Sequence, residues 1–149
     1  MDDSVRSQFG YEEILRAMRD QADALGALRG GAGTLFAAIA LATSFFGGAA
    51  LTSENGHLGD ATWIAIGAFF AAGALVLAVL FLGDLTFSAD EAELRQIMNG
   101  SLTIPGIAEQ LLRRYASNKQ RLKALRVVFL LAAVALFVEV AFWIIGLVE

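Results

Sequence analysis

Three long runs of apolar residues alternate with polar segments along this chain of 149 residues. The runs cover residues 32–51, 61–83 and 127–148 and together contain one ionisable residue, Glu139. Each run reaches the length of roughly 20 residues that a helix needs to cross a bilayer. Backbone groups in hydrocarbon must be paired within their own segment, so each run is predicted to be a transmembrane helix. The alternative, a buried soluble bundle, would leave too little polar surface to cover three such helices.

Basic residues are confined to two of the polar segments. Four Arg precede the first run and seven Lys or Arg lie between the second and third, whereas the turn at 52–60 has none. Because Lys and Arg favour the cytoplasmic side, we expect the N-terminus and the 84–126 segment inside and the C-terminus outside. Trp63 and Trp143 would then lie toward the outer interface, where aromatic residues are enriched. Residues 1–31 lack the apolar core of a signal peptide, so the first run is expected to be retained.

The segment before the first run is predicted to be an amphipathic cytoplasmic helix over 11–29. Its stripe recurs every three or four residues and consists of Tyr11, Ile14, Met18, Gln21, Leu25 and Leu28. Three glycines follow at the membrane entry, namely Gly30, Gly31 and Gly33. Glycine destabilises a helix by about 1 kcal/mol relative to Ala. The glycines are therefore interpreted either as a passive joint or close helix crossing, or as a hinge that couples the cytoplasmic helix to the first run.

Two helices are predicted between the second run and the chain end. The pattern from Ser88 to Glu91 is a capping box that opens a short helix ending near Asn99. Pro105 suits the first turn of a second helix, and nothing interrupts the pattern from there through the third run. We expect one helix from about 105 to 147, roughly 60 Å long, whose first part forms a cytoplasmic stalk.

The stalk has an apolar stripe and a basic surface. The stripe consists of Ile104, Ile107, Leu111, Tyr115, Asn118, Leu122 and Leu125. A lone Asn on such a stripe can set register or oligomer number, so Leu111, Asn118 and Leu122 are predicted at an oligomer interface. The basic residues are expected to contact anionic lipid headgroups, because no aromatic or groove-reading motif indicates nucleic acid. They are Arg113, Arg114, Lys119, Arg121, Lys123 and Arg126.

Glu139 lies near the middle of the third run. Counted from the cytoplasmic edge of each run, it has the same depth as Thr43 and Ser44. An intramembrane acid faces the bundle, a partner or water. Two interpretations follow. In one, a protonated Glu139 is hydrogen-bonded to Thr43 or Ser44. In the other, Glu139 lines a pore as a ring of carboxylates in an oligomer, with Thr43 and Ser44 at the same level.

Composition excludes several classes of protein. The chain has no Cys and one His, His57, so thiol chemistry and histidine metal sites are not expected. We find no phosphate loop, dinucleotide fingerprint or nucleophile–base pair. An enzyme is therefore not expected, nor is a cofactor. Internal repeats and broken midplane helices, which mark secondary transporters, are not evident either.

The order of these segments resembles a known group. A charged helix runs into a span in QADALGALRGGAGTLFAAIALATSFFGGAAL, and a basic helix runs into another in LLRRYASNKQRLKALRVVFLLAAVALFVEVAFW. This architecture is similar to that of small prokaryotic anti-phage membrane effectors, the SMODS- and SLOG-associating two-transmembrane (SLATT) group and the Pycsar-type transmembrane effectors. The resemblance implies a subunit that oligomerises and permeabilises the inner membrane when a partner or nucleotide signal arrives.

Taken together, the sequence predicts an all-α, multi-pass protein of the cell inner membrane. Its parts are a cytoplasmic helix (1–31), a transmembrane hairpin (32–83), a cytoplasmic loop (84–104) and a stalk with the third transmembrane helix (105–149). The leading hypothesis is a homo-oligomer that forms or gates a pore in prokaryotic defence. The alternative is a membrane anchor or structural subunit that holds a soluble signalling or sensor partner at the membrane.

Overall fold

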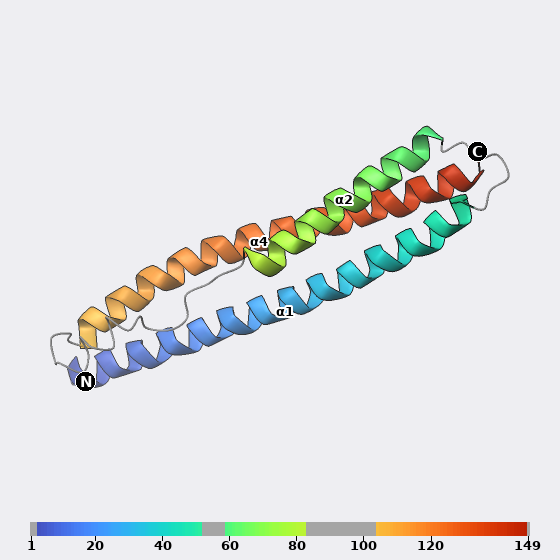
Figure 1. Ribbon diagram of the computed structural model, residues 1–149. Coiled ribbons are helices and arrows are strands. Elements are labelled where there is room, and N and C mark those ends of the chain that lie inside the picture. Colours follow the sequence, from blue (N-terminus) through green and yellow to red (C-terminus); the bar gives the residue numbers. More distant parts are fainter. Residues whose placement is uncertain (1–2, 52–58, 83–103, 149) are drawn as a thin grey trace. The chain divides into compact units, whose positions relative to one another are not determined.

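The computed structural model describes residues 3–51, 59–82 and 104–148. Three α-helices make up almost all of these residues: α1 (Asp3–Leu51), α2 (Asp60–Phe81) and α4 (Ile104–Val148), as Figure 1 shows. Each contains a stretch long and apolar enough to cross a membrane. The all-helical fold with three candidate membrane spans is therefore confirmed. The helix expected after Ser88 lies outside the described residues, as does most of the 52–60 turn.

Helix α1 joins the predicted amphipathic helix and the first apolar run in one element. It runs for 49 residues from the amphipathic segment into the first apolar run, without a break at Gly30, Gly31 or Gly33. Helical stability in proteins comes mainly from packing rather than from intrinsic propensity. Gly31 shows this, because a Cβ atom added there would lie 3.4 Å from the ring of Phe129 on α4. A close helix approach thus stabilises a segment whose glycines disfavour a helix on their own.

The chain divides into two compact units. The first unit joins Met1–Gly26 with Asp84–Ala124, and the second joins Ala27–Gly83 with Leu125–Glu149. In the first unit the predicted stripes of α1 and α4 are buried at Met18, Gln21 and Leu25 and at Asn118 and Leu122. Gln21 Nε2 donates a hydrogen bond to the carbonyl oxygen of Tyr115 at 3.1 Å, which links the two helices within this unit.

All three helices contribute to the core of the second unit. Its buried residues are Ala32 and Ile39 from α1, Ala72, Val76 and Val79 from α2, and Ala132 from α4. Half of these are alanines, which let helix backbones approach closely. Gly146 has the same role between α4 and α2, since a Cβ atom there would lie 3.0 Å from Thr62 Oγ1.

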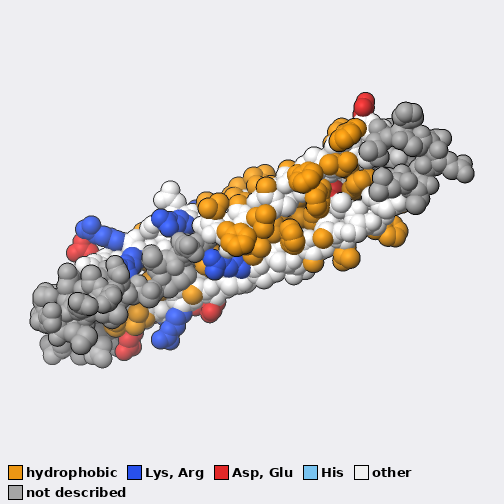
Figure 2. All heavy atoms as spheres, in the orientation of Figure 1, with side chains coloured by type: hydrophobic (Ala, Val, Ile, Leu, Met, Phe, Trp, Pro, Cys, Tyr) orange, Lys and Arg blue, Asp and Glu red, His pale blue; other side chains and the backbone are white. Residues whose placement is uncertain are grey.

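The outer surface of the second unit is strongly apolar. Phe45, Phe70, Phe81 and Phe137 are each exposed over two thirds or more of their surface. Figure 2 shows hydrophobic side chains gathered over α2 and the last part of α4. An apolar surface of this kind is rare on a soluble monomer, and it suits contact with lipid chains.

Candidate functional site

Among the residues that the structure describes, the packed interior of the second unit contains one acidic side chain. Glu139 on α4 is fully buried, with 0% of its surface exposed. Its Oε1 atom accepts a hydrogen bond from Thr43 Oγ1 on α1. Ala132 and Trp143 lie on the same face of α4 and are also buried. The depth match in the sequence thus corresponds to a direct contact between α1 and α4.

The indole of Trp143 lies near this carboxyl group. The side chain of Trp143 approaches the Glu139 carboxyl from one turn further along α4. However, Trp143 Nε1 and Glu139 Oε2 do not reach hydrogen-bond geometry, and neither has another partner among the described residues. An unpaired donor and an unpaired acceptor therefore lie on one helix face. Buried polar groups without partners are uncommon in native proteins, and two of them lie here in the interior of the second unit.

Trp143 is enclosed by helix packing, in contrast to Trp63. It is only 3% exposed, whereas Trp63 is 61% exposed. Room for the Trp143 ring comes from Gly47 on α1, where an added Cβ atom would lie 3.8 Å from Cη2 of the indole. The expectation that both tryptophans lie toward the outer face concerns their depth along the helices, so it stays a prediction; the structure adds that helix packing encloses the ring of Trp143.

Ser44 lies apart from the Thr43–Glu139 pair. It is exposed, and its hydroxyl donates to the carbonyl oxygen of Ala40 in its own helix at 2.7 Å. Consecutive residues point about 100° apart around a helix, so Thr43 and Ser44 cannot both face Glu139. This arrangement favours the interpretation in which Glu139 is packed against a hydroxyl. Of the three candidates Thr43, Ser44 and Glu139, only Ser44 lies on an outer surface.

The exposed side of α1 in the second unit carries a row of small residues. We call it the small-residue face, and it consists of Gly30, Gly33, Ala37, Ala40 and Ser44, all exposed. Added Cβ atoms at Gly30 and Gly33 would meet nothing within 4 Å, in contrast to the enclosed Gly31. The spacing of these residues is visible in the sequence. Ala32 and Ile39, which are buried, and Gly31, which is half-buried, lie on other sides of α1, and the sequence alone does not distinguish these sides.

The residues predicted for an oligomer interface lie inside the first unit. Asn118 and Leu122 are buried at 2% and 7% exposure, and Leu111 is half-buried. Their stripe packs within a single chain rather than lying open to a second copy.

The hinge role of Gly30, Gly31 and Gly33 stays a prediction. Helix α1 is continuous through these three glycines.

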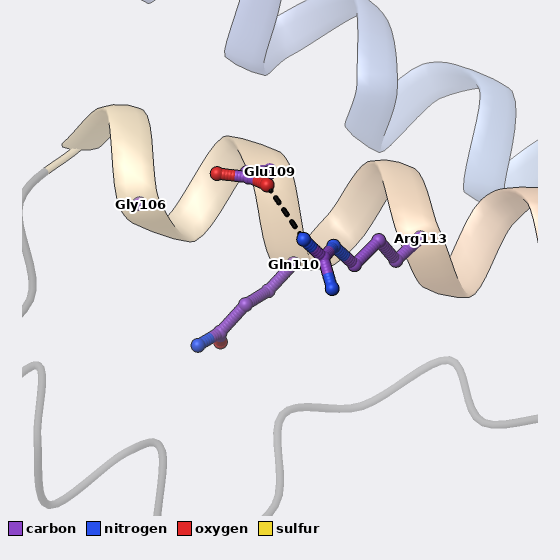
Figure 3. Close-up of a pocket in the computed structure, with 4 residues that line it drawn as sticks. All are labelled: Gly106, Glu109, Gln110 and Arg113. Carbon is purple, nitrogen blue, oxygen red and sulfur yellow. Dashed lines mark hydrogen bonds and ion pairs between the residues drawn. The ribbon is translucent and has the colours of Figure 1, made fainter.

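The predicted headgroup-contact residues are mostly exposed on α4. Lys119, Arg121, Lys123 and Arg126 are exposed, and Arg114 is half-buried. Arg113 forms an ion pair with Glu109 one turn earlier, at 2.9 Å. Figure 3 shows this pair on α4. A surface hollow of about 310 Å³ is lined by Gly106, Glu109, Gln110 and Arg113. The charge of Arg113 is thus partly compensated within its own helix.

Within residues 3–51, 59–82 and 104–148, no group of three or more His, Cys, Asp or Glu side chains could hold a metal ion. Comparison of the chain with protein-family models, with curated proteins and with solved structures finds no match.

Proposed function

We propose that this protein is a homo-oligomer of the cell inner membrane that forms or gates a pore, acting as a membrane-disrupting effector in prokaryotic defence. The N-terminus and the basic part of α4 face the cytoplasm in this proposal. The observation that carries it is the small-residue face of α1, which the described chain leaves uncovered.

Small residues on a membrane helix serve contact with another helix. Glycine and alanine present little surface to lipid but allow two backbones to approach closely, and hydroxyl groups add hydrogen bonds. The chain uses this principle internally at Gly31 and Gly146, where another helix lies close. Gly33, Ala37 and Ala40 repeat the pattern on the outside, flanked by large exposed side chains such as Leu41 and Phe45. In this proposal, α1 of a second subunit packs against the small-residue face.

A pore needs polar groups that remain near the contact between subunits. Ser44 lies on the small-residue face, and Thr34 is exposed beside it and donates to the carbonyl oxygen of Gly30 at 3.2 Å. Each hydroxyl oxygen retains acceptor capacity while its hydrogen is used within α1. Hydroxyls can line a water path without the cost of burying a charge. Glu139, which is enclosed in one chain, is not required for this lining.

The absence of cysteine from the chain permits a clean test of the contact. Single cysteines at Ala40, on the small-residue face, and at Leu41, on the adjacent surface, form a matched pair in one turn of α1. Under mild oxidation in native membranes, Ala40→Cys should cross-link into dimers, whereas Leu41→Cys should not. Equal cross-linking at both positions would indicate random collision and would remove the support for this contact.

The alternative is a membrane anchor for a soluble partner. An anchor can also oligomerise, so the two functions differ in membrane permeability rather than in assembly. Expression of the chain should depolarise cells and slow their growth if it forms a pore. An anchor should leave the membrane potential unchanged at the same membrane density.

A further inference from the structure

Three cations share one outer face of α4. Lys119, Lys123 and Arg126 are separated by four and three residues, the spacing that aligns side chains on one side of a helix. All three are exposed. The same side continues into Leu130, Val134 and Phe137, which are 62%, 58% and 76% exposed. The alignment depends on the helical repeat of α4 alone.

The other cations of α4 are placed differently. Arg113 is paired with Glu109. Arg114 and Arg121 project more than about 120° away around the helix from Lys119, at 100° per residue, and both take part in interactions of their own. No Asp or Glu occurs between Arg113 and Glu139 in the sequence. Of the six basic residues expected to contact headgroups, three therefore remain as candidates, namely Lys119, Lys123 and Arg126.

The step from charged to apolar on this face is abrupt. Arg126 is followed on the same side by Leu130, so the change takes one helical turn. If acyl chains contact Leu130, Val134 and Phe137, the cations reach the headgroup layer. The row from Lys119 to Arg126 spans about 10 Å along the axis, and a headgroup layer is roughly 5 to 8 Å thick. Long basic side chains adjust over the remaining distance.

We propose that Lys119, Lys123 and Arg126 bind the headgroup phosphates of anionic phospholipids. Charge complementarity and continuity with the lipid-facing surface both support this partner. Arg126 offers a planar fork of donors to a phosphodiester, and the two lysines act as mobile point charges. Nucleic acid fits less well, because the row is narrow and runs directly into an apolar surface. The proposal is independent of pore formation.

The test uses the full chain in bilayers that contain spin-labelled phosphatidylglycerol or phosphatidylcholine. The unaltered protein should retain phosphatidylglycerol at its surface several-fold over phosphatidylcholine. The triple variant Lys119→Gln, Lys123→Gln, Arg126→Gln should bring this ratio close to one, since the charges that attract the anionic headgroup are then absent. Salt at about 1 M should lower the ratio for the unaltered chain, because it shortens the screening length to about 3 Å.

A matched control removes three exposed cations elsewhere, by Arg16→Gln, Arg19→Gln and Arg113→Gln. This variant has the same net charge as the triple variant and should keep the lipid preference. A charge-conserving variant, Lys119→Arg, Lys123→Arg, Arg126→Lys, should keep it too. Circular dichroism and gel filtration check the folding of each protein, and the salt titration of the unaltered chain does not depend on any variant.

Three results would overturn the proposal. One is the absence of a phosphatidylglycerol preference in the unaltered chain. Another is an equal preference in the triple variant and the matched control. The third is binding of a short RNA that the triple variant loses while its lipid preference is unchanged, which would assign the row to nucleic acid instead.

Discussion

The hydroxyl group of Thr43 on α1 donates a hydrogen bond to the buried carboxyl group of Glu139 on α4, which lies 96 residues further along the chain. No basic side chain occurs between residues 127 and 148 or between 32 and 51. A carboxylate there would be buried without a counter-charge, at a cost that normally keeps such a group neutral. We therefore expect Glu139 to be a neutral hydrogen-bonding link between the two helices.

The hydrogen bond between Thr43 and Glu139 predicts that replacing one partner costs more unfolding free energy than replacing the other. Thr43→Val keeps the shape of the side chain but leaves Glu139 without its hydroxyl partner, and should destabilise the second unit by about 1–3 kcal/mol. Glu139→Leu should cost less, because the Thr43 hydroxyl can bond a carbonyl of its own helix, as Ser44 does. The double variant should be more stable than Thr43→Val alone. Unfolding free energies in mixed micelles give these values, and an equal cost for the two single changes would contradict the account.

Two neighbouring glycines are predicted to respond differently to enlargement. Gly31→Leu should destabilise the chain by about 1–3 kcal/mol, because the new side chain meets the Phe129 ring. Gly33→Leu has open space around it in a single chain and should leave chain stability unchanged while weakening the oligomer. Thermal unfolding and oligomer size in detergent separate the two effects. Loss of stability in Gly33→Leu without a change in oligomer size would place Gly33 inside the fold instead.

The continuity of α4 is predicted to matter for activity. Ala124 is exposed within this helix. Ala124→Pro removes a backbone hydrogen bond and should cost about 3 kcal/mol or more, whereas Ala124→Gly should cost only about 1 kcal/mol. Growth inhibition by the expressed chain should be lost in the proline variant and retained in the glycine variant. Full activity and assembly in Ala124→Pro would show that the continuous helix has no functional role.

The predicted orientation can be tested with single cysteines at Asp60 and Lys119, both of which are exposed. With the basic residues inside, a membrane-impermeant thiol reagent should label Asp60→Cys in intact spheroplasts. Lys119→Cys should be labelled only after lysis. Labelling of position 119 in intact spheroplasts would reverse the topology.

The helices were predictable from the sequence because their signals are local. An unbroken apolar run such as 61–83 has few alternatives to a membrane helix, since its backbone must pair internally. Depth along a span was also readable, which is why Thr43 could be matched with Glu139. The side of the helix on which a residue is buried could not be predicted, because it depends on which neighbouring helices pack against that side. Thr43 and Ser44 share a depth yet point to different surfaces, and only Thr43 contacts the carboxyl group.

Features decided by packing between helices were missed for the same reason. The sequence left a passive joint, a close helix crossing or a hinge open at the glycines before the first run, and in the structure the ring of Phe129 lies close to Gly31 in a continuous helix. The burial of Trp143 was not predictable either, because it depends on Gly47, which opens a space that encloses its ring. Neither partner could be identified from the sequence of a single helix.

Ion flux through vesicles is the most direct test of pore formation. The full chain is reconstituted into vesicles with a potassium diffusion potential, beside the Gly33→Leu variant at equal protein density. The account predicts that the unaltered chain dissipates the potential and that the variant, folded but less associated, dissipates it more slowly. If the unaltered chain assembles into oligomers and yet leaves the potential intact, this result would contradict the pore and favour an anchor.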